Sequence, residues 1–105
     1  MNAARILVAA VVLSVTGAAA GQSPQDLLQK NGCTACHAID KKVIGPAYND
    51  VSVKYKGDAS APAKLMTKVK QGGAGVWGSV PMPPNTQVSD ADNKAMVTYI
   101  LGLKK

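Results

Sequence analysis

The segment Cys33–His37 contains both cysteines and the only histidine of the chain. Cys33 and Cys36 are three residues apart and His37 follows directly, so one helical turn would bring the two sulfurs and the imidazole to the same side. Two thiols at this spacing can form thioether bonds with the two vinyl groups of a porphyrin edge, while the imidazole binds the iron. The segment therefore predicts covalent attachment of a c-type haem, with His37 as one axial ligand.

Three other uses of these cysteines fit the rest of the sequence less well. A disulfide between Cys33 and Cys36 would close too short a loop to restrain the unfolded chain, and there is no other cysteine with which to build a framework. A thioredoxin-like redox pair would need alternating strands and helices around it, a pattern that the sequence lacks. A zinc site would have to take its fourth ligand from the aspartates, since the chain has no second histidine, third cysteine or glutamate.

Residues 1–20 have the pattern of a cleaved export signal. They begin with positive charge, continue through an unbroken apolar run over 6–13, and end in three alanines that suit a signal peptidase. The apolar stretch is shorter than the ~20 residues that a transmembrane helix needs, so an uncleaved membrane anchor is the weaker alternative. We expect cleavage after Ala20, which leaves residues 21–105 as one domain in the periplasm.

That remaining domain is close to the size below which a hydrophobic core alone struggles to hold a fold. The chain has no phenylalanine, and its aromatic residues are one tryptophan and three tyrosines. A haem is large, flat and mostly apolar, so it would fill the interior that these side chains cannot fill. We therefore expect the haem to form the core of the domain.

The charged residues also limit the function. The formal net charge of +6 falls to +5 when Arg5 leaves with the signal, and every remaining cation is a lysine. Arginine is the residue best suited to reading bases and phosphates, and no nucleic-acid motif is present, so a role on DNA or RNA is disfavoured. The positive charge either aids solubility or steers the protein toward an acidic partner protein, and composition alone does not separate the two.

Apolar spacing and capping residues predict four helices and no strand. Ser23 marks the start of the first helix, and Ser89 caps the last. The glycines and prolines between 74 and 88 predict an irregular loop before the last helix. The expected helices cover about residues 24–32, 47–56, 60–71 and 89 to the end of the chain.

Residues 73–78 match the G-x-G-x-x-G pattern of dinucleotide-binding sites. The pattern has that meaning only between a strand and the first turn of a helix. Here it follows a lysine-rich helix and precedes three prolines, so we interpret the match as chance.

Because His37 is the only histidine, this chain cannot supply a second axial imidazole. The remaining candidates are a methionine, a lysine or an open position. Met66 and Met96 lie on the apolar faces of expected helices, where core packing explains them. Met82 lies between prolines, whose fixed torsions lower the entropy cost of holding its side chain in one place. We therefore expect Met82 to be the second ligand, and His37, Met82 and Trp77 to line the cavity that receives the haem.

Four segments, in this order, resemble the short bacterial class I cytochromes c, and the resemblance covers residues 22–105. They are Cys33–His37, Ile44–Tyr48, Gly75–Gly78 and Pro81–Asn85. The resemblance implies an all-α fold of the small class I cytochrome c type, in which about four helices surround one covalently bound haem c. It also implies an electron carrier, not an enzyme, that shuttles single electrons between respiratory complexes and a terminal reductase or oxidase.

The resemblance assigns roles to individual residues. The Pro46 carbonyl would accept a hydrogen bond from the free ring N–H of His37 and fix the orientation of the imidazole. Met82 would bind the iron on the other side, with Asn85 near its sulfur. The Trp77 indole N–H would reach a haem propionate, with a half-buried core aromatic as the alternative reading of this residue.

Further expectations concern Gly32, to which the resemblance assigns a role, the partners, and the oligomeric state. Gly32, on the first helix, would let the last helix approach closely near Tyr99. The partners would be acidic redox proteins, with a donor such as a membrane cytochrome complex and an acceptor such as nitrite reductase or a terminal oxidase. The carrier would be a monomer with no membrane span after cleavage.

The competing functions are a gas-sensing or peroxidase haem, which needs an open iron position, and a thiol-disulfide or metal-binding module.

Overall fold

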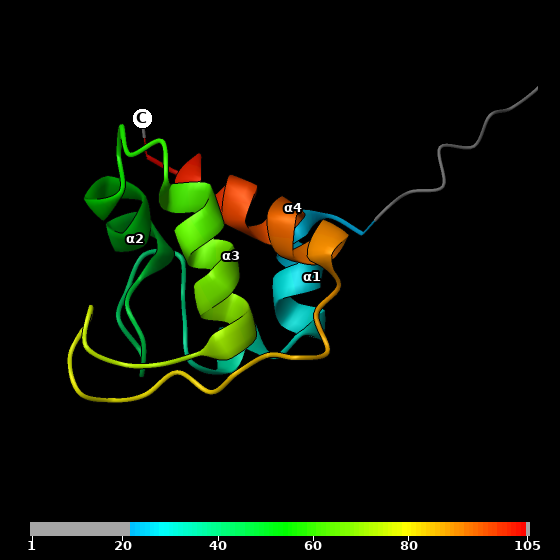
Figure 1. Ribbon diagram of the computed structural model, residues 1–105, viewed down its shortest axis with the longest axis horizontal. Coiled ribbons are helices and arrows are strands. Elements are labelled where there is room, and N and C mark those ends of the chain that lie inside the picture. Colours follow the sequence, from blue (N-terminus) through cyan, green and yellow to red (C-terminus); the bar gives the residue numbers. More distant parts are fainter. Residues whose placement is uncertain (1–21, 105) are drawn as a thin grey trace, which may run out of the picture.

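The computed structural model describes residues 22–104, so the expected signal peptide over 1–20 and its cleavage site lie outside the described residues. Within that range the chain forms four α-helices and a single 3₁₀ turn, and the only β-type pairings are two isolated bridges. The all-α prediction is confirmed. The elements are α1 (Pro24–Lys30), η1 (Cys33–Ala35), α2 (Tyr48–Lys54), α3 (Ala61–Gln71) and α4 (Asp90–Leu101) (Figure 1).

The last helix, α4, organises the fold because it packs against each of the other three α-helices. In Figure 1, α3 lies between α1 and α2, and α4 crosses behind it. The long segment between α3 and α4, coloured yellow to orange, extends below the helices before it returns to α4. The predicted irregular loop is therefore present, and it closes one side of the helical cluster.

Serine caps begin the first and last helices, as predicted. The Ser23 hydroxyl accepts a hydrogen bond from the Asp26 N–H at 3.2 Å, and the Ser89 hydroxyl accepts one from the Asp92 N–H at 3.1 Å. The first helix is shorter than expected, because it ends at Lys30 instead of near residue 32.

Gly32 does not have the role that we expected for it. It lies outside α1 and has φ +74°, and a Cβ built on it would meet no atom within 4 Å. The expected close approach of the last helix at this glycine is therefore wrong. Glycine is favoured here because the left-handed backbone conformation disfavours other residues, and this turn directs the chain into η1.

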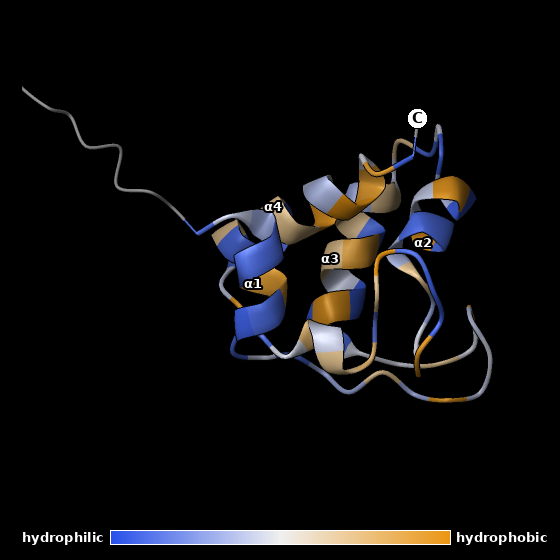
Figure 2. Cartoon of the chain, turned by 180° about the vertical axis from the view of Figure 1, so that it is seen from behind, coloured by the Kyte–Doolittle hydropathy of each residue, from blue (hydrophilic) through white to orange (hydrophobic). Residues whose placement is uncertain are grey.

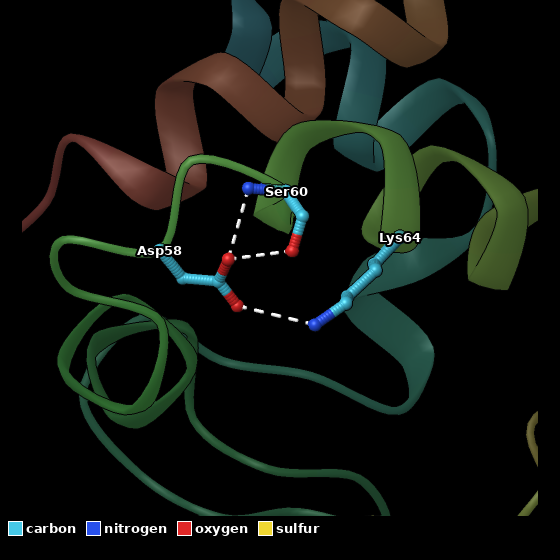
Figure 3. A network of polar contacts seen from close by, with 3 residues as sticks. All are labelled: Asp58, Ser60 and Lys64. Carbon is cyan, nitrogen blue, oxygen red and sulfur yellow. Dashed lines mark hydrogen bonds and ion pairs between the residues drawn. The ribbon is translucent and has the colours of Figure 1, made fainter.

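The start of α3 is held by Asp58. Its Oδ1 accepts hydrogen bonds from the Ser60 N–H at 2.9 Å and the Ser60 hydroxyl at 2.6 Å, and its Oδ2 pairs with Lys64 Nζ at 3.3 Å (Figure 3). The hydrogen bonds from Ser60, followed by the nearby Lys64 charge, lower the pKa of Asp58 below its usual value. Ser60 makes no side-chain capping bond, so the sequence located the start of this helix but not the group that secures it.

The buried core is small. Its main cluster contains residues from the first, second and last helices, together with one residue from the loop: Leu27, Leu28, Tyr48, Val51, Val88, Met96 and Ile100. Figure 2 shows hydrophobic and hydrophilic residues alternating along the same helices, as expected of helices that bury one face only.

Candidate functional site

A cavity of about 270 Å³ opens between the helices and the segments that connect them. It is bordered by α2, α3 and α4, by residues on either side of Gly45, and by the loop around Met82. His37, Met82 and Trp77 all line it, so the cavity expected from the sequence is confirmed. Its helical walls are largely apolar and include Val51, Leu65, Val69, Val97 and Ile100.

His37 is held in one orientation within this cavity. Its Nδ1 lies 2.7 Å from the Pro46 carbonyl oxygen, and its ring stacks on Tyr48 with centroids 4.8 Å apart and planes 19° apart. A carbonyl can only accept a hydrogen bond, so in the neutral imidazole Nδ1 carries the proton and Nε2 has the lone pair. His37 therefore presents the ring nitrogen that can bind a metal.

Gly45 gives the His37 ring the room it needs. A Cβ built on Gly45 would lie 2.5 Å from His37 Cε1 and 2.9 Å from Nδ1, distances at which atoms overlap. In the sequence Gly45 was only one residue of the matching segment Ile44–Tyr48. Its contact with His37 could not be found from spacing, because seven residues lie between the two and the loop that they form has no regular structure.

The two cysteines lie in and just after η1, and they are not bonded to each other. The Cys33 carbonyl accepts hydrogen bonds from the N–H groups of Cys36 at 3.2 Å and His37 at 3.0 Å, which closes the turn. Cys36 lines the cavity, while Cys33 packs against the core. Burial raises the pKa of the Cys33 thiol, and burial together with the adjacent Cys33 raises the pKa of Tyr48.

Met82 is fixed through its backbone. The Met82 N–H donates to the Gly73 carbonyl and the Gly73 N–H donates to the Met82 carbonyl, each at 2.9 Å. The neighbouring Gly72, with φ +66°, has no space for a side chain, since a Cβ there would lie 2.3 Å from the Met82 oxygen. Two glycines at the end of α3 thus allow the loop to pass close to the helix and to bring Met82 to the cavity.

Comparison with known proteins agrees with this geometry. The family model described as Cytochrome c matches residues 21–104. A cytochrome c-551 from Allochromatium vinosum is 58% identical over 77 residues, which covers 73% of this chain and 82% of that protein. A cytochrome c-552 from Nitrosomonas europaea is 50% identical over 96 residues, which covers 91% of each chain. The crystal structure of wild-type Nitrosomonas europaea cytochrome c552 superposes with a TM-score of 0.74 at 51% identity, over 76% of this chain and 99% of that one.

The chain belongs to the cytochrome c family. It has the small all-α class I fold, carries one covalently bound haem c, and is an electron carrier and not an enzyme. The residues around the cavity fit that group, because the walls are apolar, His37 offers Nε2, and the Gly45 backbone leaves the imidazole space. No helix within residues 22–104 is long and apolar enough to cross a membrane.

The zinc alternative is not supported by this cytochrome's structure. Among the described residues, no three His, Cys or Asp side chains come close enough together to hold a metal ion. The thioredoxin-like alternative needed strands around the cysteines, and the strand-like pairings within residues 22–104 are two isolated bridges, His37–Lys42 and Gly73–Met82.

Trp77 and Asn85 occupy different positions relative to the cavity. Trp77 lines it and remains 42% exposed, with Lys54 Nζ 5.5 Å from the centre of its ring. Asn85 is not among the lining residues, and its expected place near the Met82 sulfur stays a prediction. Its side-chain amide donates to the carbonyls of Val69 at 3.3 Å and Pro83 at 3.2 Å, and its backbone N–H donates to Val69 at 2.9 Å. Asn85 therefore ties the loop that carries Met82 to α3.

Proposed function

We propose that this cytochrome carries single electrons in the periplasm with its iron held by His37 and Met82, and with thioether links from Cys33 and Cys36. The haem iron supplies the redox chemistry by gaining and losing one electron. The observation that carries the proposal is that His37, with Nε2 free, and Met82 line the same cavity, beside Cys36. A thioether sulfur opposite an imidazole favours a raised reduction potential, and two protein ligands keep the metal site from rearranging when its charge changes.

The other methionines are poorer candidates for the second ligand. Met96 is 2% exposed and belongs to the buried core cluster. Met66 is not among the residues that line the cavity, and its carbonyl accepts a hydrogen bond from Asn93 at 2.9 Å. Lysine is the more serious competitor, because Lys42 and Lys68 also line the cavity. The test must therefore distinguish sulfur ligation from amine ligation.

Met82→Ala is the decisive variant. It should abolish the far-red absorption band that sulfur–iron ligation gives in the oxidised protein, and it should lower the reduction potential, because the sulfur ligand is lost. Met66→Leu and Met96→Leu are matched controls that keep a similar side-chain volume. Each should lower the free energy of unfolding by less than about 1.5 kcal/mol and leave the band intact. Loss of the band in either control, or its survival in Met82→Ala, would reject the assignment.

Three further residues support the site in this proposal. Pro46 orients His37 by accepting its Nδ1–H, and Trp77 donates its indole N–H to a haem propionate. Asn85 contributes by securing the Met82 loop through the Val69 carbonyl. Trp77→Phe keeps an aromatic ring but removes the donor, so an unchanged pH dependence of the reduction potential in that variant would reject the propionate bond.

We propose that the redox partners are acidic proteins, with a membrane cytochrome complex as donor and a nitrite reductase or terminal oxidase as acceptor. Lys42 and Lys68 border the cavity, and Lys54 lies over Trp77 at its edge, so positive charge surrounds the place where electrons would leave. Such a surface speeds encounter with a negatively charged partner. The carrier would act as a monomer.

The proposal includes export to the periplasm, with residues 1–20 removed. The charge, apolar run and alanines of that segment support it. The mass of the purified protein should equal that of residues 21–105 plus one haem. A mass that includes residues 1–20 would contradict cleavage.

A further inference from the structure

Lys70 makes two contacts that have no role in the proposed function described above. It lies in the last turn of α3, and its ammonium donates a hydrogen bond to the Val88 carbonyl and lies 3.8 Å from the Asp90 carboxylate. Its side chain is 32% exposed, whereas that of Asp90 is 94% exposed. The bond to Val88 is therefore the more shielded of the two contacts.

Val88 needs such a donor. The residue is 1% exposed, so its carbonyl has almost no access to water, and an unpaired buried carbonyl is costly. A charged donor makes a stronger hydrogen bond than a neutral one. Among the hydrogen bonds of residues 22–104, Lys70 is the lysine whose ammonium reaches a main-chain carbonyl.

The position of this bond links it to Met82. The loop between α3 and α4 is fixed at its start, where Gly73 pairs with Met82, and further along, where Asn85 bonds Val69. Lys70 fixes the far end, where the loop reaches α4. The three attachments all go to the last turns of α3 or directly after it, so they hold the loop against one short surface.

We propose that Lys70 is a positioning residue that latches the far end of the Met82 loop and thereby controls how readily the Met82 sulfur leaves the iron. The proposal rests on Met82 as the second axial ligand. For the sulfur to leave, the loop must move away from the cavity, and the Lys70–Val88 bond resists that movement from the C-terminal side. Losing it should speed the departure of Met82 without removing the ligand.

The test measures ligand exchange in the oxidised holoprotein with imidazole as the probe. At saturating imidazole the rate of loss of the far-red band is limited by the departure of Met82. Lys70→Met keeps the chain length but removes the donor, and we expect it to raise that limiting rate about tenfold. Lys70→Arg restores a charged donor and should return the rate to within about threefold of the unaltered protein.

Lys64→Met is the matched control, because Lys64 lies on the same helix and pairs with Asp58 at the surface. It should leave the limiting rate unchanged. Equal rates in Lys70→Met and the unaltered protein would overturn the latch, and so would an equal acceleration in Lys64→Met, because that would indicate a general effect of surface charge. A spectrum without the far-red band in the unaltered protein would instead overturn Met82 ligation itself, and the Lys70 proposal with it.

Discussion

At the residue scale, three neighbours fix His37. Pro46 accepts its Nδ1–H, Tyr48 stacks on the ring, and the missing side chain of Gly45 leaves the space that the imidazole occupies. In the proposed role of axial ligand, a His37 ring fixed in this way would keep Nε2 directed at one point, so the metal site would change little when the iron gains or loses an electron. Residues that are not proposed as ligands therefore fix the orientation of His37 in advance.

Gly45→Ala tests this arrangement. The added Cβ would overlap the His37 ring, so the imidazole or the Gly45 backbone must shift. We expect a loss of about 1–3 kcal/mol in the free energy of unfolding of the holoprotein, as overpacking of a fixed site usually costs. Chemical denaturation followed by visible absorption would measure it.

Gly102→Ala is the matched control for that experiment. A Cβ there would meet only carbonyl oxygens at 3.5 and 3.6 Å, which is ordinary contact, and its φ is −89°. Its free energy of unfolding should change by less than about 0.5 kcal/mol. If both variants lost the same stability, the effect would belong to glycine replacement in general and not to His37.

The residues proposed to carry chemistry could be predicted from the sequence, and so could the support of His37 by the Pro46 carbonyl, which the resemblance implied, but the other supports could not. Cys33, Cys36 and His37 are adjacent, so their spacing alone indicated a haem. Tyr48 stacks on His37 across an irregular loop, and no local pattern predicts a contact of that kind. The Asn85 amide bonds Val69 and Pro83, a partnership that depends on how the loop folds back on α3.

At the element scale, helix starts were predictable and some helix ends were not. Serine before a helix is a local signal, and both predicted caps are present at Ser23 and Ser89. The end of α1 at Lys30 depends on the left-handed Gly32, which the sequence placed inside the helix. The path of the loop after α3 could not be predicted from local sequence patterns either, because the loop is held by hydrogen bonds between residues that are distant in the sequence.

Loss of the Ser89 cap of α4 should destabilise the fold more than loss of the Ser60 hydroxyl at the start of α3. Ser89→Ala removes the acceptor for the Asp92 N–H at the beginning of the helix that packs on all the others, and we expect a loss of about 1 kcal/mol in unfolding free energy. Ser60 caps no helical N–H, and the bond from its hydroxyl to Asp58 is exposed to water, so Ser60→Ala should lower the free energy of unfolding by less than about 0.5 kcal/mol. Thermal unfolding of the two variants would compare them, and a larger loss for Ser60→Ala would contradict the capping account.

At the scale of the whole molecule, the net charge is positive, and part of it lies beside the cavity. Every cation within residues 21–105 is a lysine, and Lys42 and Lys68 border the cavity. Attraction between exposed charges is screened by salt, with a Debye length that falls from ~30 Å at 0.01 M to ~10 Å at 0.1 M. The sequence predicted the sign of this charge, but its placement around the cavity required the fold.

Electron transfer to an acidic acceptor should therefore slow as ionic strength rises over this range. Stopped-flow measurement of the second-order rate would follow the change, and Lys42→Gln should weaken the dependence on salt. Lys94→Gln is the control, because Lys94 is not among the residues that line the cavity. A rate that does not change with salt would mean that the positive surface serves only solubility.

In the proposed site the protein fills both axial positions of the iron, one with His37 and the other with the Met82 sulfur, which its loop holds in place. Carbon monoxide binding by the reduced protein at neutral pH tests this directly, because an incoming ligand must first displace that sulfur. We predict slow and weak uptake, and faster uptake in Pro83→Gly, which adds freedom to the loop while the thioether links remain. Rapid, stoichiometric uptake by the unaltered protein would contradict the claim and favour a ligand-binding haem.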